Sequence, residues 1–70
     1  MKRLVGENFA RIRRERELTQ EQVAELSGFG QQYISGLERG HRNPTIVTIY
    51  ELSQALGVKP VDLVQENIKG

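Results

Sequence analysis

The 70-residue sequence contains no cysteine, no tryptophan and a single histidine, His41. Disulfides and thiolate metal sites are therefore excluded, and one histidine among scattered carboxylates does not make a zinc or catalytic cluster. No nucleophile and base set and no glycine-rich phosphate loop can be recognised, so we expect neither an enzyme nor a bound cofactor. Apolar packing alone must hold the fold together.

Long apolar runs are absent as well. Nothing approaches the roughly 18 consecutive apolar residues of a membrane span, and the start from Met1 to Gly6 has no signal-peptide core. We therefore expect a cytoplasmic protein with no membrane contact. A chain of this length buries only about 60% of the surface that its unfolded form exposes. We expect one domain over residues 1–70 that needs an efficient core or a dimer partner.

Basic residues are missing from the middle of the chain, so the net charge of +1 conceals an uneven distribution of charge. Residues 1–16 carry a net charge of +4, residues 17–38 a net charge of −4, and residues 39–42 a net charge of +2. Contacts with a polyanion such as DNA would therefore have to come from the two basic flanks.

Apolar residues recur at spacings of three and four, and no segment alternates with period two for long enough to form a strand. The pattern predicts an all-α fold. The expected helices cover residues 4–16, 20–27, 31–38, the stretch between the cap Thr45 and the stop Gly57, and 60–66. Thr19 and Gln22 form a capping box at the start of the second helix, and Pro60 opens the fifth.

The spacing between Gln20 and Leu37 suits two helices that cross through a tight turn, as in the reading head of a helix-turn-helix protein. Ala24 is expected at the crossing, because a larger side chain would push the helices apart. Gly28 is expected in the left-handed conformation that ends the first of the two helices. Ile34 and Leu37 would then turn one face of the second into the core. The residues left on its outer face are Gln31, Gln32 and Ser35.

Two stretches of the sequence resemble the phage-repressor (Cro and XRE type) helix-turn-helix family. They are LTQEQVAELSGFGQQYISGLERGHRNPT at residues 18–45 and LSQALGV at residues 52–58. The neighbourhoods of Tyr33 and Arg42 also look like those of restriction-modification controller proteins. The resemblance implies a single five-helix, lambda-repressor-like DNA-binding domain in which the second and third helices form the helix-turn-helix.

The resemblance also implies roles for individual side chains. The residues expected to contact bases are Gln31, Gln32 and Ser35. A glutamine amide can pair bidentately with adenine. Gln20 would meet a phosphate at the start of the second helix, where the helix dipole favours an anion. The other expected phosphate contacts are Tyr33, Arg39, Arg42 and Asn43. Arg13 and Glu38 would form an ion pair between the first and third helices, either as an orienting bridge or as an ordinary surface pair.

Two positions depart from the family pattern. Gly36 is expected at an exposed position of the third helix, where family members often carry a longer side chain. Either this face is unused or the backbone approaches DNA closely there. Lys59 stands where the family usually has a Ser or Thr cap before the last helix.

The fourth helix carries more apolar residues than one buried face requires, and the additional ones are Ile46, Val47 and Tyr50. They are either partly exposed surface or a dimer interface, and in so small a domain we favour the interface.

These features predict a transcriptional regulator, a repressor or autoregulator that binds a pseudo-palindromic operator in double-stranded DNA. It would bind as a homodimer with residues 31–38 in the major groove. Activation, unlike repression, would need a surface for RNA polymerase, which Glu21 and Glu25 on the second helix could supply. The alternative is a protein-interaction module, antitoxin-like or an adaptor, which the acidic segment 17–38 would suit.

Overall fold

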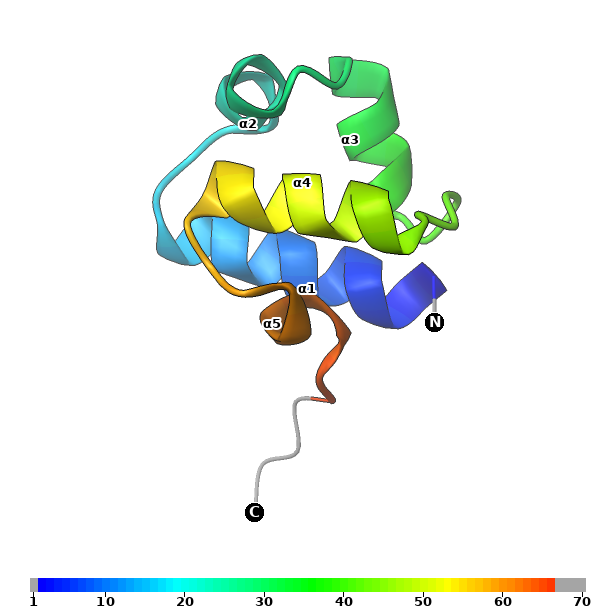
Figure 1. The fold of residues 1–70 in the computed structure, drawn as a ribbon. Coiled ribbons are helices and arrows are strands. Elements are labelled where there is room, and N and C mark those ends of the chain that lie inside the picture. The colour runs from blue at the N-terminus through cyan, green and yellow to red at the C-terminus, as the bar shows by residue number, and fades with distance from the viewer. Residues whose placement is uncertain (1, 67–70) are drawn as a thin grey trace.

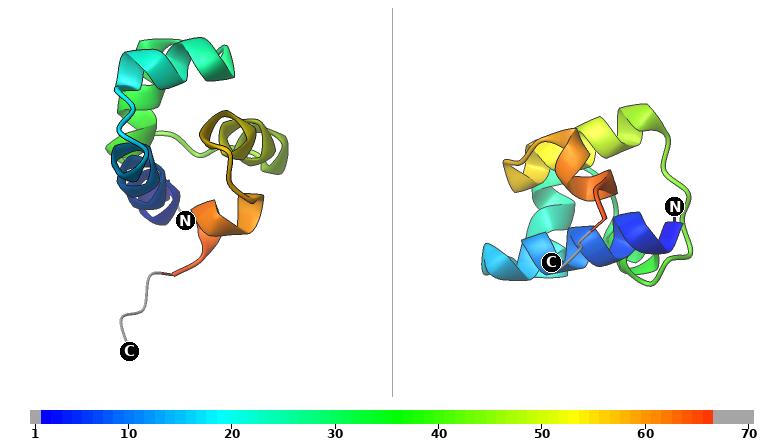
Figure 2. Two further views of the ribbon diagram at one scale, coloured as in Figure 1. Left: turned by 90° about the vertical axis from the view of Figure 1, so that its left-hand side faces the viewer. Right: turned by 90° about the horizontal axis from the view of Figure 1, so that it is seen from below.

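The computed structural model describes residues 2–66, and between these residues it contains helices and no strands. The helices are α1 (Lys2–Glu15), α2 (Gln20–Ser27), α3 (Gln31–Glu38), α4 (Ile46–Leu56) and α5 (Pro60–Val64). α1 and α4 run in similar directions, with α2 and α3 across one side of them and α5 on the other (Figures 1 and 2). The all-α prediction is confirmed, whereas the predicted domain, 1–70, extends beyond the described residues. No helix described is both long enough and apolar enough to span a bilayer.

The caps of α2 and α4 are formed by the residues that the sequence indicates. The Gln22 amide N–H donates to Thr19 Oγ1 at 3.0 Å, and the Thr19 N–H donates to Gln22 Oε1 at 2.8 Å. At α4, the Thr48 N–H donates to Thr45 Oγ1 at 3.2 Å. Gly28 ends α2 in the left-handed conformation, with φ of 81°. The predicted bounds of α2, α3 and α4 are confirmed, and those of α2 and α4 follow from these local signals.

The predicted bounds of α1 and α5 are less accurate. α1 begins at Lys2 and ends at Glu15, because Glu17 takes a left-handed backbone with φ of 57° that the helix cannot continue through. α5 ends at Val64 instead of near residue 66. Lys59 supplies no side-chain cap to α5, and only the reverse half of a capping box is present, in which the Lys59 N–H donates to Asp62 Oδ2 at 3.0 Å.

The end of α5 is set by Asn8, a side chain from the other end of the chain. Asn8 is only 2% exposed, and its Nδ2 donates to the carbonyl oxygens of Leu63 and Gln65, both at 2.9 Å. These bonds satisfy carbonyls that the end of a helix leaves without a partner. Asn8 thereby fastens α5 to the middle of α1.

Every helix contributes to a single core. The fully buried side chains include Phe9, Val23, Ile34, Leu52 and Leu63, one from each helix. Burying one such side chain stabilises the fold by about 1.5–3 kcal/mol. Leu18, Ala24 and Phe29 pack against this core from its edge. The core therefore extends into the helix-turn-helix, and Ala24 lies in the packed region as expected.

A glycine allows α1 and α3 to pack closely. A Cβ built on Gly6 would overlap the carbonyl oxygen of Leu37 and lie 3.2 Å from that of Glu38. No real Cβ approaches a backbone oxygen as closely as the first contact, so only glycine fits at this crossing. Sequence reasoning missed Gly6, although a glycine inside an amphipathic helix costs about 1 kcal/mol and is itself a signal of close packing.

Candidate nucleic-acid interface

The carboxylate of Glu38 joins the first three helices. Arg13 Nε donates to Glu38 Oε2 at 2.6 Å and its Nη2 donates to Glu38 Oε1 at 3.1 Å, while Arg13 Nη1 donates to the Leu18 carbonyl at 2.7 Å. The side chains of Arg13 and Glu38 are only 12% and 6% exposed. The pair is therefore an orienting bridge, with the bidentate geometry that makes an Arg–carboxylate contact strong.

Gln20 is part of the same network. Its Nε2 donates to Glu38 Oε1 at 3.0 Å, so one amide N–H faces the protein. The predicted phosphate contact of Gln20 stays a prediction, and the second N–H of the amide is the donor left for it. The bond fixes the amide at the start of α2, where the backbone N–H groups and the helix dipole also favour an anion.

The outer face of α3 is polar at its start. Gln31 and Gln32 are exposed, and Ser35, one turn later, is half-buried. Ile34 and Leu37 are completely buried on the opposite side. The helix therefore offers two amides and a hydroxyl to a partner while its other side is fixed in the core.

Tyr33 lies in a stack of side chains beside this face. Its ring stacks on Phe29 with centroids 5.0 Å apart, and the Arg42 guanidinium carbon lies 5.3 Å from the Tyr33 centroid. Burial raises the pKa of the Tyr33 hydroxyl above its usual value, and the charge of Arg42 partly lowers it. Because Phe29 and Arg42 lie against the ring, the hydroxyl is the group that remains for a phosphate contact.

The expectation that Gly36 is exposed is wrong. Gly36 is buried, because the Arg42 side chain lies over it. A Cβ built on Gly36 would lie 3.3 Å from Arg42 Nε and 3.5 Å from its Cγ. The space that a longer side chain would fill is thus taken by an arginine from the following loop. An open hollow of about 400 Å³ lies here, and it is lined by Gln32, Ser35, Gly36, Arg39, His41 and Arg42.

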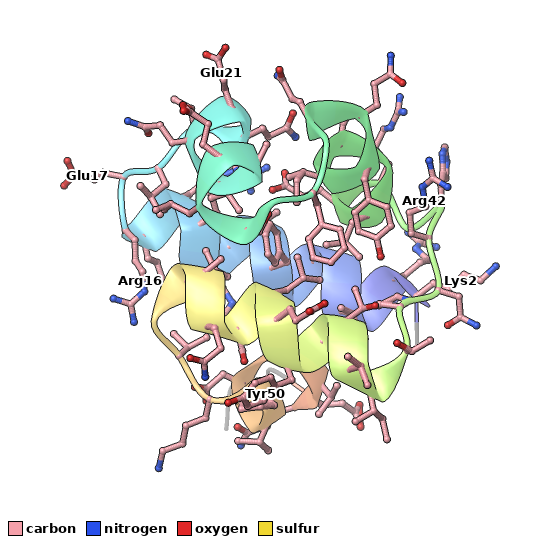
Figure 3. The ribbon with its side chains drawn as sticks, turned by 45° about the horizontal axis from the view of Figure 1, so that its top comes forward. Lys2, Arg16, Glu17, Glu21, Arg42 and Tyr50 are labelled. Carbon is pink, nitrogen blue, oxygen red and sulfur yellow. The ribbon has the colours of Figure 1, made fainter. Side chains whose placement is uncertain are left out.

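The start of α1 lies against the loop between α3 and α4. A Cβ built on Gly40 would lie 3.0 Å from Arg3 Cγ, and Figure 2 shows the beginning of α1 next to this loop. Lys2 and Arg42 lie on the same side of the molecule, and Arg16 lies on another (Figure 3). The fold therefore brings part of the first basic segment together with the second. The predicted phosphate contacts Arg39, Arg42 and Asn43 are all exposed here.

A separate surface, on α4 and α5, is apolar. Ile46, Val47 and Tyr50 are 85%, 66% and 54% exposed, and Val61 on α5 is 52% exposed. Sequence reasoning singled out the first three and missed Val61. α4 and α5 pack against one another, so the apolar groups belong to neighbouring elements. Side chains of this size are rarely left in water in such a group without a partner.

Comparison with known proteins agrees with this geometry. The model of a helix-turn-helix family matches residues 9–63. The chain is 67% identical over 64 residues to the HTH-type transcriptional regulator y4dJ of Sinorhizobium fredii, itself uncharacterized, covering 91% of this chain and 83% of that protein.

Two solved structures are also similar. The restriction-modification controller protein C.AhdI from Aeromonas hydrophila has a TM-score of 0.83 at 38% identity, with 87% of this chain and 92% of that chain covered. The controller protein C.Esp1396I, solved as a tetramer with its natural 35 base-pair operator, has a TM-score of 0.82 at 35% identity, with 90% and 83% covered.

Proposed function

Because the chain belongs to the Cro/XRE-type helix-turn-helix family, we propose that it is a sequence-specific DNA-binding transcriptional regulator. It acts as a repressor or autoregulator on a pseudo-palindromic operator, which it binds as a homodimer with one α3 in the major groove of each half-site. The observation that carries the proposal is the exposed amide pair, Gln31 and Gln32, at the start of a helix whose other side is buried.

Gln31, Gln32 and Ser35 read the bases. Each glutamine amide has a donor and an acceptor, the pattern that matches adenine in the major groove, and one good pair gives about 1–3 kcal/mol of discrimination. Ser35, one turn further along, reaches a base edge after the two amides have entered the groove. The buried bridge at Glu38 holds α3 at a fixed angle to α2, which supports this reading.

The phosphates are held by groups that surround the reading face. They are Gln20 at the start of α2, the Tyr33 hydroxyl, and Arg39, Arg42 and Asn43 at the end of α3 and in the loop that follows. These contacts fix the register of the protein on the duplex and carry no sequence information. The acidic residues Glu21 and Glu25 are exposed on α2, and the polymerase contact through them stays a prediction.

The second copy packs on Ile46, Val47 and Tyr50. A two-fold axis makes such a patch self-complementary, so one apolar surface serves both protomers. The two α3 helices must then reach major grooves about 34–36 Å apart on one face of the duplex.

Random-site selection with the purified protein tests the proposal. We expect an enriched site with two-fold symmetry. Fluorescence anisotropy on that site should give a log–log salt slope near −5 to −7, as about six to eight phosphate contacts require. A flat salt response would contradict DNA binding and would favour a protein partner.

Gln31→Ala and Gln32→Ala test the reading residues. Each should cost about 1–3 kcal/mol on the selected site and leave binding to random DNA nearly unchanged. Gln54→Ala, the same change at an exposed position of α4, is the matched control and should leave both affinities unchanged. Equal losses on both kinds of DNA would show that Gln31 and Gln32 do not read sequence.

A further inference from the structure

Arg42 belongs to an exposed loop, yet its side chain packs against α3 from Cγ to the guanidinium. Its Cγ and Nε lie beside the α-carbon position of Gly36, 3.5 and 3.3 Å from where a Cβ would be. Its guanidinium lies over the Tyr33 ring, and that ring also stacks on the ring of Phe29. Gly36, which has no side chain, and the aromatic ring of Tyr33 thus form a seat for the Arg42 side chain.

A free arginine side chain has many rotamers, and it loses this freedom when it grips a ligand. A seat that already selects one arrangement reduces that loss, which is the general effect of preorganisation on binding. Stacking of a guanidinium on an aromatic face adds an attraction of its own. Glycine is a poor residue for the interior of a helix such as α3, so its presence at position 36 calls for a compensating contact, and Arg42 provides it.

We propose that Gly36 is a positioning residue for Arg42, and that it directs the guanidinium to the edge of the DNA-reading face beside Gln32 and Ser35. The proposal rests on the proposed function and deepens it. The guanidinium lies at the rim of the hollow that those two side chains line, on the outer side of the molecule in Figure 3. There it presents a fork of donors that suits phosphate oxygens or the acceptor atoms of a base edge.

Two substitutions of graded size test the seat in the free protein. Gly36→Ala places a methyl group against Arg42, and Gly36→Leu fills the seat. The Arg42 guanidinium carbon lies over the Tyr33 ring, 5.3 Å from its centroid, so we expect the ring current to shift the NMR signals of the neighbouring Arg42 side-chain protons upfield in the wild type. We expect this shift to shrink with the alanine variant and to disappear with the leucine variant. An unchanged shift in the leucine variant would overturn the seat, whatever the protein binds.

Affinity for the selected operator tests the function of the seat. Gly36→Leu should weaken binding about tenfold, as expected for coupled neighbours, and in an Arg42→Ala background it should cause no further loss. Arg39→Ala is the matched control, since Arg39 lines the same hollow and the three atoms nearest a Cβ on Gly36 all belong to Arg42, and in this background Gly36→Leu should still cost its full factor. An equal loss in both backgrounds would mean that the introduced leucine side chain itself obstructs DNA, and would overturn the proposal.

Thermal melting separates positioning from folding. Both Gly36 variants should melt near the wild-type temperature, because the gain in helix propensity over glycine offsets the lost contact between Arg42 and Tyr33. A lower melting temperature that accounts for the lost affinity would overturn the positioning role. If the wild type bound no DNA of any sequence, the proposed function and the DNA role of Arg42 would both fail, and the NMR measurement would still decide whether the seat exists.

Discussion

α3 and α4 are both fixed to the core by one aliphatic face, and they differ in what they turn outward. α3 exposes Gln31 and Gln32, whereas α4 exposes Ile46, Val47 and Tyr50. α3 is held in addition by a close backbone contact at Gly6 and by the Glu38 network, and α4 is held mainly by buried side chains. A helix that reads a hydrated polyanion needs a fixed position and polar groups. A helix that pairs with its own copy needs apolar area, which water leaves when the copies meet.

Gly6→Ala should produce the largest effect, because it separates α3 from α1. The new methyl group would collide with the Leu37 carbonyl, so we expect a loss of about 3 kcal/mol or more in the free energy of unfolding. A domain of this size has only about 4–10 kcal/mol of stability, so the loss removes a large share of it. Urea unfolding followed by circular dichroism measures it.

Gly30→Ala is the matched control for Gly6→Ala. A Cβ at Gly30 meets nothing within 4 Å, so this variant should lose far less stability. Similar losses in the two variants would show that the α1–α3 contact is not what makes Gly6 necessary.

Glu38→Gln should have the second largest effect, because it leaves Arg13 poorly solvated and without its charge partner. The pair is mostly buried, and removing one partner of such a pair costs about 2 kcal/mol after allowance for its remaining exposure. Chemical denaturation measures the loss. Glu15→Gln is the matched control, because it removes an exposed ion pair in which the Glu15 side chain is 60% and the Arg11 side chain 39% exposed. It should change the free energy of unfolding by about 0.5 kcal/mol at most. Equal effects would mean that burial of the bridge does not matter.

Val47→Asp should act on α4 alone and spare the fold. A charge in the apolar patch should raise the dimer dissociation constant at least tenfold, about 1.4 kcal/mol. Because Val47 is exposed within the protomer, the stability of the protomer should change by only about 0.5 kcal/mol. Analytical ultracentrifugation over a range of concentrations measures both species. Leu26→Asp is the matched control on α2, and dissociation by this variant instead would place the interface at α2.

The smallest expected effect is on the titration of Tyr33. Burial raises its pKa and Arg42 lowers it, so Arg42→Ala should raise the pKa further, provided that the ring stays buried. Tyrosinate absorbance in a Tyr50→Phe background isolates the signal. The folded pKa is above the unfolded value of about 10, so the stability linked to Tyr33 is present below pH 10 and is lost as the pH rises through the folded pKa. A lower pKa in the Arg42 variant would contradict the contact.

The sequence predicted those parts of the fold that depend on neighbouring residues. The limits of α2 and α4 follow from Thr19, Gly28, Thr45 and Gly57, whose hydroxyls or left-handed backbones act within one turn. The apolar spacing likewise identified most of the core. The family resemblance supplied the Arg13–Glu38 pair, which joins residues 25 positions apart.

The features that escaped prediction depend on contacts between distant parts of the chain. The limit of α5 follows from Asn8, which is 55 residues away from its partner Leu63. Gly36 was misplaced on the surface because the residue that covers it, Arg42, belongs to a loop whose path no local signal determines. Asn8 and Gly6 were both visible as unusual residues within an amphipathic helix, but their partners were not.

α1 connects the two surfaces that the proposed complex uses. It contacts α3 through Gly6 and Arg13, and it contacts α5 through Asn8, while α5 packs on α4. A single helix thus links the surface that we propose enters the groove to the surface that we propose meets the second copy. Changes inside α1 that keep the fold would therefore alter the distance between the two half-sites that the dimer accepts, and would leave the base sequence of each half-site as it was.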